Sequence, residues 1–540
     1  LIPFFMTEAN NESLWWQNGI VYQVYPRSFQ DSDGDGVGDL RGIIKRLDYL
    51  KWLGIKALWI SPIYPSPMAD FGYDVSDYKA IHPMFGDMED FDSLLSEIHS
   101  REMKLILDFV PNHTSDQHPW FLESKSSRDN PKRDWYLWKD ANEDGSVPNN
   151  WRSVFGGSGW EWDENTEQYY YHGFLKEQPD LNWRNPEVQE AMLDVMRFWL
   201  DKGVDGFRVD VMWHMVKDDK WRDNPINPDY EQHMPTYDEL LPVYSTDQPE
   251  VHDIIRKMRE LLDSYHERMM IGEIYLPLNK LMSYYGIDNN GAHLPFNFKL
   301  LSLPWDSQKI ATAIDEYEGV LPDEGWPNWI LSNHDNPRIA SRVGLDQAKV
   351  AAVLLLTLRG TPTIYYGDEI GMRDVPIPFE EVQDPQGLNM PDKNLSRDPA
   401  RTPMQWDDTE NAGFTKGKPW LRVDKKFPRV NVEIQKTTPD SMLSLYKRLI
   451  DLRLKENALL VGDYVPIHSD RQIIVYCRHA PGSSRFMVLL NLSHRPCYFK
   501  PETPISGTIE VAISPELEGT KVNEIISLSG DEALIVRLED

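Results

Sequence analysis

Hydrophobic residues along this chain follow two spacings that alternate. A segment with apolar residues every three to four positions, typical of a helix, is followed by a short continuous apolar run, typical of a buried strand. Most of these apolar runs end in polar or charged residues. The pattern predicts eight strands, over residues 20–25, 55–60, 104–110, 204–210, 269–274, 293–298, 328–332 and 363–366.

Helix-period segments separate many of these strands. Eight strand–helix units with polar residues at the strand ends predict a (β/α)₈ TIM barrel. Strands covered on both faces should be continuously apolar, as most of these are. A doubly wound sheet with scattered ion pairs is the alternative that the pattern leaves open. The predicted helices span residues 40–53, 90–100, 187–202, 250–265, 347–358 and 441–455.

Three stretches depart from this rhythm. The segment after the third strand is rich in Trp, Asn, Asp and Gly and has no helical period, so we expect a subdomain that leans over the barrel mouth. A Pro-rich stretch at 371–420 predicts a long loop after the last strand. Beyond it, short β-type runs predict an antiparallel domain. The expected division is a barrel over 12–113 and 180–461, an inserted subdomain over 114–179 and a C-terminal β-sandwich over 462–540.

Composition narrows the partners and the compartment. The formal net charge of −30 argues against nucleic acid or an anionic membrane as partner. No apolar run approaches the length of a membrane span, and the apolar residues 1–5 lack the basic region and cleavage site of a signal peptide. Only Cys477 and Cys497 are present, too few for a disulfide framework. We expect a cytoplasmic protein; its oligomeric state stays open.

Charged and polar side chains follow several of the predicted strands. Arg208 and Asp210 lie two residues apart on one strand and therefore share a face. Taken alone, this pair is most simply a structural salt bridge. In a barrel, however, the C-terminal strand ends converge on one mouth, which favours a catalytic site. The side chains expected to meet there are Asp108, His113, Arg208, Asp210, Glu273, His334 and Asp335.

Acidic residues alternate with other residues, glycines among them, in a short segment after the first strand. The spacing matches the first half of a calcium-binding loop. Gly42 stands where an EF-hand has its bidentate Glu, so the loop is not an EF-hand. We expect one structural Ca²⁺, with Mg²⁺ or an empty acidic turn as alternatives. The expected ligands are Asp31, Asp33, Asp35, Asp39 and the backbone carbonyl of Val37.

The predicted mouth contains three carboxylates, Asp210, Glu273 and Asp335. No Ser or Cys nucleophile stands beside a His at a strand end, no Cys/His spacing indicates zinc, and no phosphate-binding loop is present. An Asp and Glu pair among many aromatic residues favours glycoside chemistry. A divalent-metal lyase or isomerase of barrel fold is the alternative that carboxylates alone leave open.

Five segments, in this order, resemble the signature segments of the α-amylase family of glycoside hydrolases. Within that family, the calcium loop, Gln-Pro-Asp-Leu-Asn and two further segments resemble the α-glucosidase and oligo-1,6-glucosidase branch. The five are Asp-Phe-Val-Pro-Asn-His at 108–113, Gln-Pro-Asp-Leu-Asn at 178–182, Gly-Phe-Arg-Val-Asp at 206–210, Gly-Glu at 272–273 and Ser-Asn-His-Asp at 332–335. The two further segments are Asp-Phe-Gly-Tyr-Asp at 70–74 and Arg-Asp-Pro-Ala-Arg-Thr-Pro-Met-Gln-Trp at 397–406.

The resemblance implies a retaining mechanism with Asp210 as nucleophile, Glu273 as general acid/base and Asp335 as a group that holds sugar hydroxyls. Arg208 is expected to favour the ionised form of Asp210, and apolar neighbours the protonated form of Glu273. Tyr73 and Phe174 would press on the sugar ring. The remaining implied pocket residues are Asp70, His113, His334 and Arg397.

Linkage preference is the open question. In the resembled branch, Val after the nucleophile, here Val211, accompanies α-1,6 linkages, and Thr accompanies α-1,4. The expected activity is release of α-glucose from short α-1,4- or α-1,6-glucosides, with transglucosylation in addition. One alternative is an isomerase or transglucosylase of maltose or sucrose; the Arg-Leu-Asp-Arg-Asp loop of sucrose isomerases is Asn-Leu-Ser-Arg-Asp here, at 394–398. Another is a non-catalytic amylase-like binding protein, which would usually lack the carboxylates.

Overall fold

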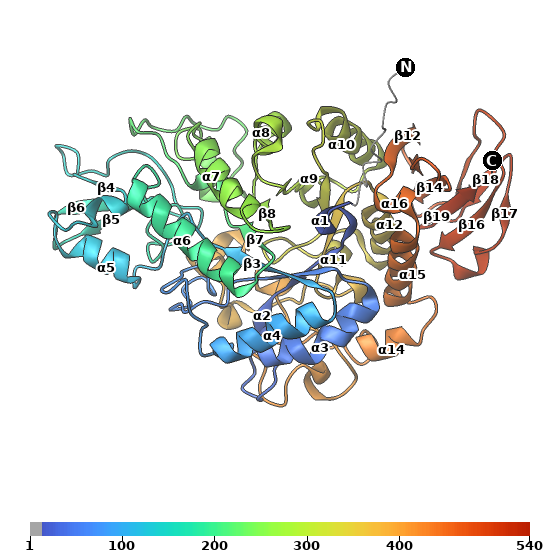
Figure 1. Cartoon of the computed structure of the whole chain (residues 1–540), viewed down its shortest axis with the longest axis horizontal. Coiled ribbons are helices and arrows are strands. Elements are labelled where there is room, and N and C mark those ends of the chain that lie inside the picture. The colour runs from blue at the N-terminus through green and yellow to red at the C-terminus, as the bar shows by residue number, and fades with distance from the viewer. Residues whose placement is uncertain (1–12, 540) are drawn as a thin grey trace, which may run out of the picture.

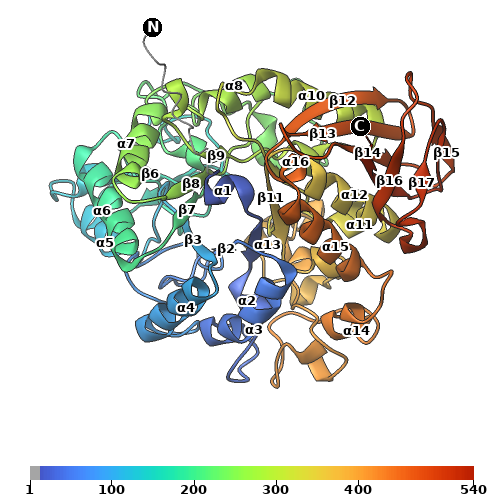
Figure 2. The same cartoon turned by 45° about the vertical axis from the view of Figure 1, so that its right-hand side comes forward.

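The structure, a computed structural model, describes residues 13–539. Eight parallel strands form one sheet, nearly closed into a barrel, in the order β10-β11-β1-β2-β3-β7-β8-β9, and helices surround it (Figures 1 and 2). The predicted (β/α)₈ fold is therefore confirmed. The strands are β1 (Val21–Val24), β2 (Ala57–Ile60), β3 (Lys104–Phe109), β7 (Gly206–Val209), β8 (Met269–Gly272), β9 (Leu294–Pro295), β10 (Asn328–Ile330) and β11 (Thr361–Tyr365).

A side chain bridges the two ends of this sheet, β9 and β10. Asn328 accepts a hydrogen bond from the backbone N–H of Asn297 at 2.9 Å and donates one to the carbonyl of Pro295 at 2.6 Å. Pro295 lacks a backbone N–H and so cannot donate to a strand ladder. The two hydrogen bonds of the Asn328 side chain therefore join β10 to the end of β9 and close the barrel at this point.

The barrel helices begin and end where capping chemistry places them. Asp39 accepts from the N–H of Gly42 at the start of α3, and Asn185 caps α6 in the same way. Gly54 and Gly203 end these helices with φ of 100° and 106°, a conformation that favours glycine. The helices are α3 (Leu40–Leu53), α4 (Met88–Ser100), α6 (Pro186–Lys202), α7 (Val251–Asp263), α10 (Ser307–Val320), α12 (Leu345–Thr357) and α15 (Met442–Lys455).

The predicted elements differ from the observed ones in two respects. Helix α10 was not predicted, because alanines and polar residues dilute its apolar face, on which Ile310, Ile314 and Tyr317 are buried. Several strands are shorter than predicted: β7 ends at Val209, so Asp210 belongs to the turn that follows it. The polar strand ends are thus the first residues of the loops at the mouth.

The segment between β3 and α6 contains regular elements although its sequence shows no helical period. It contains a helix and a three-stranded antiparallel sheet, and it lies at the opposite end of the molecule from the C-terminal sheet (Figure 1). Its small core is built from Trp151, Trp160 and Tyr171. The elements are α5 (Pro119–Ser126), β4 (Trp138–Lys139), β5 (Trp160–Asp163) and β6 (Gln168–Tyr171).

The C-terminal part is antiparallel, as predicted. Its main sheet has the order β12-β13-β14-β19-β16-β17, beside a pair formed by β15 and β18. Tyr476 and Arg478 of β13 contact Thr357 at the end of α12, which joins this sheet to the barrel. The strands are β12 (Asp463–Ser469), β13 (Ile473–His479), β14 (Phe486–Asn491), β15 (Cys497–Phe499), β16 (Gly507–Ala512), β17 (Lys521–Val522), β18 (Ile526–Leu528) and β19 (Ala533–Leu538).

Two expectations concern the compartment. Cys477 and Cys497 lie on different strands and are both free thiols. Within residues 13–539, no helix has the length and apolar character needed to span a membrane. The apolar residues 1–5 lie outside the described part of the chain.

Candidate active site

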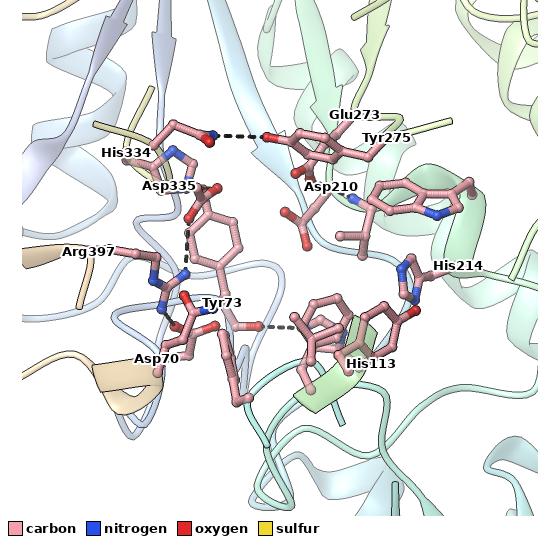
Figure 3. Close-up of a pocket in the computed structure, with 18 residues that line it drawn as sticks. Asp70, Tyr73, His113, Asp210, His214, Glu273, Tyr275, His334, Asp335 and Arg397 are labelled. Atoms are coloured by element: carbon pink, nitrogen blue, oxygen red, sulfur yellow. Dashed lines mark hydrogen bonds and ion pairs between the residues drawn. The ribbon is translucent and has the colours of Figure 1, made fainter. Parts of the chain in front are cut away.

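A cavity of about 280 Å³ opens at the C-terminal ends of the barrel strands (Figure 3). The lining comes from loops that follow several strands and from the segment between β3 and β7. Ten of the eleven predicted catalytic and substrate-binding residues line it, and Arg208 is the exception. These ten are Asp70, Tyr73, His113, Phe174, Asp210, Val211, Glu273, His334, Asp335 and Arg397.

Arg208 lies fully buried beneath the cavity and connects three carboxylates. Its Nη1 contacts Asp108 at 2.9 Å and Asp210 at 2.6 Å, and its Nη2 contacts Glu273 at 2.7 Å. The strand register explains the first contact, because Asp108 of β3 pairs directly with Arg208 of β7. The salt bridge expected from the sequence exists, and it also holds the two candidate catalytic carboxylates on one guanidinium.

The electrostatics of Asp210 differ from the expectation. Burial raises the pKa of Asp210 well above its usual range; Arg208 opposes this rise, and repulsion from Glu273 and Asp108 adds to it. Arg208 does not dominate because one positive charge is shared among three carboxylates. Burial likewise raises the pKa of Glu273, with Arg208 opposing and Asp335 adding to the rise. Both carboxyl groups therefore hold a proton more readily than they would in water, and the guanidinium that they share couples their titrations.

Val211 has an unusual backbone that contributes to the site. Its φ of 36° and ψ of 48° lie in the left-handed region, which a β-branched residue rarely adopts. In this conformation its backbone N–H donates to Oε2 of Glu273 at 2.9 Å. Strain of this kind persists at functional sites when the surroundings fix it. Val211 therefore positions Glu273 through its backbone while its side chain lines the cavity.

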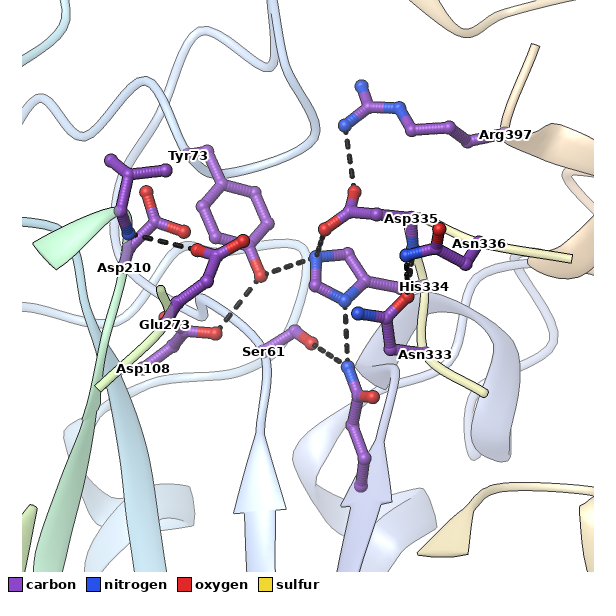
Figure 4. Close-up of polar contacts among 12 residues, drawn as sticks. Ser61, Tyr73, Asp108, Asp210, Glu273, Asn333, His334, Asp335, Asn336 and Arg397 are labelled. Carbon is purple, nitrogen blue, oxygen red and sulfur yellow. Dashed lines mark hydrogen bonds and ion pairs between the residues drawn. The ribbon is translucent and has the colours of Figure 1, made fainter. Parts of the chain in front are cut away.

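His334 has a defined tautomer (Figure 4). The side-chain amide of Gln23, on β1, donates to Nδ1 at 2.9 Å, so the ring proton is on Nε2. Nε2 lies 2.7 Å from the hydroxyl of Tyr73 and 3.3 Å from Asp335, and the Tyr73 hydroxyl donates in turn to Asp108 at 3.0 Å. Burial lowers the pKa of His334 well below its usual value, so the ring is neutral.

Asp335 is surrounded by positive charge. Arg397 contacts its Oδ1 at 3.0 Å, and Arg401 contacts the same oxygen at 3.1 Å. Burial disfavours ionisation, but the electrostatic effects of the adjacent His334 ring and of the Arg397, Arg401 and Arg208 guanidinium groups hold the pKa of Asp335 well below its usual range. Asp335 is therefore ionised and can accept hydrogen bonds from sugar hydroxyls.

Arg397 also joins the far wall of the cavity. Its Nη2 contacts Asp70 at 2.8 Å and Asp384 at 2.7 Å. Asp384 was not predicted, because it lies in the Pro-rich stretch where no periodicity distinguishes it. Arg401 was also missed, although it belongs to the quoted segment at 397–406 and could have been found there. Gln23 could have been noticed as the one polar residue in the apolar run of β1.

His113 lies against Phe174 at a ring-centroid distance of 5.2 Å, and burial lowers its pKa to about 4. Below it, the ammonium group of Lys217 lies between Asn112, at 2.7 Å, and Asp180, with which it forms a buried salt bridge. Asp180 belongs to the Gln-Pro-Asp-Leu-Asn segment. This buried lysine therefore anchors that segment to the loop that carries His113.

Comparison with known proteins shows the family of the chain. A family model described as "Alpha amylase, catalytic domain" matches residues 23–462. The chain belongs to the α-amylase family. Among curated members, an oligo-1,6-glucosidase of Parageobacillus thermoglucosidasius is 41% identical, with 93% of this chain and 95% of that protein covered. An alpha-glucosidase of Apis mellifera is 44% identical, with 80% and 78% covered.

Solved structures of two other enzymes superpose closely on nearly the whole chain. The alpha-glucosyl transfer enzyme XgtA matches with a TM-score of 0.92 and 38% identity, covering 98% of this chain and all of that one. The trehalulose synthase MutB of Pseudomonas mesoacidophila MX-45 matches with a TM-score of 0.89 and 36% identity over the same shares. Membership of the α-amylase family makes this protein a glycoside hydrolase. Its relatives include both hydrolases and a glucosyl transfer enzyme.

The acidic loop before α3 brings three of its predicted ligands together. One carboxylate oxygen each of Asp31, Asp33 and Asp39 lies within 4.8 Å of the others. Asp35 is not part of this group, and its carboxylate accepts from the N–H of Val37 at 2.8 Å. The loop packs on the long segment after β11, since Asp31 accepts a hydrogen bond from the Thr415 hydroxyl.

Proposed function

We propose that this glycoside hydrolase is a retaining α-glucosidase that releases α-glucose from the non-reducing end of short α-1,4- or α-1,6-glucosides. The observation that carries the proposal is the placement of Asp210 and Glu273 on one buried guanidinium, at the base of a cavity that fits a small sugar. The names of the oligo-1,6-glucosidase and alpha-glucosidase relatives support it. Arg397, paired with Asp70, forms part of the cavity wall and favours a terminal glucose over a continuing chain.

In the first step, a carboxylate oxygen of Asp210 attacks C1 of the glucose while Glu273 protonates the glycosidic oxygen. The C1–O bond breaks, the aglycone leaves, and a β-glucosyl ester of Asp210 forms. We propose that the resting pair carries one proton and that Glu273 donates it. Asp335, held ionised, accepts hydrogen bonds from sugar hydroxyls, and these strengthen as positive charge develops on the ring.

In the second step, Glu273 removes a proton from a water molecule, and the water oxygen attacks C1 from the face that the aglycone left. The ester bond breaks, Asp210 is regenerated, and Glu273 keeps the proton with which the cycle began. Tyr73 and Phe174 are proposed to contact the faces of the sugar, with Asp70, His113, His334 and Arg397 on its hydroxyls. Two displacements at C1 leave the product in the α configuration.

Product analysis tests the proposed function. Incubation with maltose, isomaltose, sucrose and trehalose is expected to release glucose from maltose, isomaltose or both. Proton NMR should show the α anomer before mutarotation. β-Glucose as first product would contradict the mechanism. A rearranged disaccharide formed without free glucose would favour the isomerase alternative. The structural similarity to the trehalulose synthase MutB is the reason to include this test.

Val211 offers a test of linkage preference. We expect Val211→Thr to lower the ratio of kcat/KM for isomaltose to kcat/KM for maltose by about tenfold. The reason is that a hydroxyl replaces a methyl group in the cavity wall. Thr keeps the β-branch, so the backbone N–H should still hold Glu273. Steady-state kinetics on both disaccharides measure the ratio. An unchanged ratio would assign linkage preference to other residues.

We further propose that the acidic loop binds one Ca²⁺ through Asp31, Asp33 and Asp39, with the Val37 carbonyl and Asp35 as additional ligands. The donor set consists of oxygens, as Ca²⁺ prefers. The wrap is tight: Gly36 has a φ of 96°, and a Cβ there would lie 1.9 Å from the carbonyl oxygen of Lys418. Bound Ca²⁺ would have a structural role, joining the loop to the segment after β11.

Thermal unfolding tests the calcium proposal. Saturating Ca²⁺ is expected to raise Tm by about 5 °C over the chelated protein, because the ion binds only the folded loop. Asp33→Ala should abolish that increase, whereas Glu143→Ala, an exposed acid outside the loop, should leave it intact. Equal Tm values with calcium and with chelator would contradict the site.

A cytoplasmic location is proposed on the two free cysteines, which suit a reducing compartment. The proposed partner is a small saccharide. Variants of the related MutB enzyme have been solved in complex with isomaltulose and with glucose, which supports that class of ligand.

A further inference from the structure

Arg401 is a second fully buried arginine that contacts a carboxylate of the cavity. It is only 1% exposed and does not line the cavity itself. Its Nε donates to the backbone carbonyl of His334 at 2.7 Å, and its Nη2 contacts Oδ1 of Asp335 at 3.1 Å. A single guanidinium therefore holds two consecutive residues of the proposed sugar site.

The two arginines that contact Asp335 differ in their other contacts. Arg397 lines the cavity and also forms salt bridges with Asp70 and Asp384. Within residues 13–539, the salt bridge to Asp335 is the only one that Arg401 forms. The charge of Arg401 is therefore directed at Asp335, whereas Arg397 divides its contacts among three carboxylates.

The two arginines leave one oxygen of Asp335 for the sugar. Both guanidinium groups contact Oδ1, whereas the one polar contact of Oδ2 in the described part of the chain is with Nε2 of His334, at 3.3 Å (Figure 4). Two charged contacts on one oxygen fix the rotation of the carboxyl group. Because the Asp335 side chain is 25% exposed and lines the cavity, Oδ2 is the oxygen that can accept a hydrogen bond from a sugar hydroxyl.

Aromatic rings fix the plane of the Arg401 guanidinium. Its Cζ lies 5.3 Å from the ring centroid of Tyr25 and 5.7 Å from that of Phe71. Tyr25 also stacks on the His334 ring, with the centroids 5.9 Å apart. One ring therefore contacts both the guanidinium and a residue that the guanidinium holds. Arginine can combine such stacking with two directed N–H donors, and lysine cannot.

The backbone on either side of Arg401 is anchored to the barrel. The hydroxyl of Tyr365, on β11, donates to the carbonyl of Ala400 at 2.9 Å. The hydroxyl of Tyr366, the next residue, donates to the carbonyl of Thr402 at 2.7 Å. These bonds fix an otherwise irregular segment, so the position of Arg401 is set before a substrate binds.

We propose that Arg401 is a positioning residue of the glycosidase reaction, which acts through Asp335 by directing Oδ2 of this carboxylate at the sugar. Arg401 would organise the sugar-binding residues as Arg208 organises the reacting carboxyl groups. The inference rests on the proposed α-glucosidase function, in which the hydrogen bonds of Asp335 strengthen as positive charge develops on the ring. A misdirected Asp335 should therefore destabilise the transition state more than the bound substrate.

Arg401→Lys tests this role, because lysine keeps the charge but cannot make both contacts. With 4-nitrophenyl α-glucoside as substrate, kcat should fall about 100-fold and KM should change by no more than about threefold. The inhibition constant of deoxynojirimycin, which carries a positive charge as the transition state does, should rise in parallel with the loss in kcat/KM. The inhibition constant of glucose should change by no more than about threefold.

Arg453→Lys is the matched control. Arg453 is also 1% exposed, and its guanidinium contacts three backbone carbonyls but no residue of the cavity. This variant should keep kcat within about twofold of the wild type even where Tm falls, since it removes a buried arginine without touching Asp335.

A pair of Tyr25 variants gives the same readout with Arg401 in place. Tyr25→Leu removes the ring that stacks on the guanidinium, so kcat should fall several-fold at nearly unchanged KM. Tyr25→Phe keeps the ring and removes a buried hydroxyl that has no hydrogen-bond partner among residues 13–539, so kcat should stay at the wild-type value.

A double-mutant cycle shows whether Arg401 acts through Asp335. In an Asp335→Asn background, Arg401→Lys should lower kcat/KM by no more than about threefold, because the carboxylate that Arg401 positions is gone. The same loss in both backgrounds, or a wild-type kcat in Arg401→Lys, would overturn the inference while leaving the α-glucosidase function intact. A wild type that hydrolyses no α-glucoside would overturn both.

Discussion

Asp210→Gly is expected to lower kcat for isomaltose by about four orders of magnitude, because no other carboxylate at the mouth can form the covalent ester. Glycine also leaves space for an external nucleophile. Added azide should attack C1 directly, from the face opposite the leaving group, and yield β-glucosyl azide. A single displacement inverts the configuration, so the product identifies which group was removed.

Asp108→Asn is the matched control for this variant. Asp108 contacts the same Nη1 of Arg208 as Asp210 does, but it does not line the cavity. Its replacement should lower kcat by about tenfold, because the Asn side-chain oxygen still offers an acceptor to Nη1, and should give no azide product. Full activity of Asp210→Gly, or α-glucosyl azide from it, would show that Asp210 is not the nucleophile.

The residues of the site that could be predicted are those whose positions follow from the spacing of residues along strands and helices. Arg208 lies on β7 and Asp210 directly follows that strand, two residues further on, and parallel strands bring Asp108 alongside Arg208. Capping residues such as Asp39 and Gly54 mark the ends of α3, which the sequence places correctly. These features are local in sequence, so the barrel and its mouth follow from them.

Features that depend on the tertiary arrangement were not predictable. Burial raises the pKa of Asp210, against the expected shift, and Arg208 opposes that rise while it contacts three carboxylates at once. Both effects depend on the positions of three strands. The left-handed backbone of Val211 has no signal in the sequence, since Val usually avoids that region. Asp384 meets Arg397 only because an irregular loop folds back over the mouth.

These tertiary contacts change how the catalytic pair is understood. If an arginine contacted only the nucleophile and kept it ionised, a different group would have to keep the general acid protonated. Here one guanidinium serves both Asp210 and Glu273, and the Val211 N–H contacts only Glu273. The same arginine thus permits one negative charge and one proton on the pair, which is the state that the first step requires.

Glu273→Ala is expected to lower kcat/KM for isomaltose by about three orders of magnitude, because its leaving group is poor without a proton donor. For an aryl α-glucoside with an acidic phenol, the rate of the first step should fall far less, because this leaving group needs no proton. The β-glucosyl ester of Asp210 should then accumulate. Azide should then release α-glucosyl azide, the opposite anomer to that expected from Asp210→Gly. Identical azide products from the two variants would contradict the assigned roles.

The pH profile gives Glu273→Ala a second readout. In the wild type, kcat/KM should fall at high pH as the pair loses its shared proton, and at low pH as Asp210 becomes protonated. Glu273→Ala removes the acid, so the alkaline limb should disappear. It also removes a negative charge beside Asp210 and leaves Arg208 to stabilise the Asp210 carboxylate, so the pKa of Asp210 should fall. The acidic limb should therefore move to lower pH, whereas loss of fold alone would reduce activity equally at every pH.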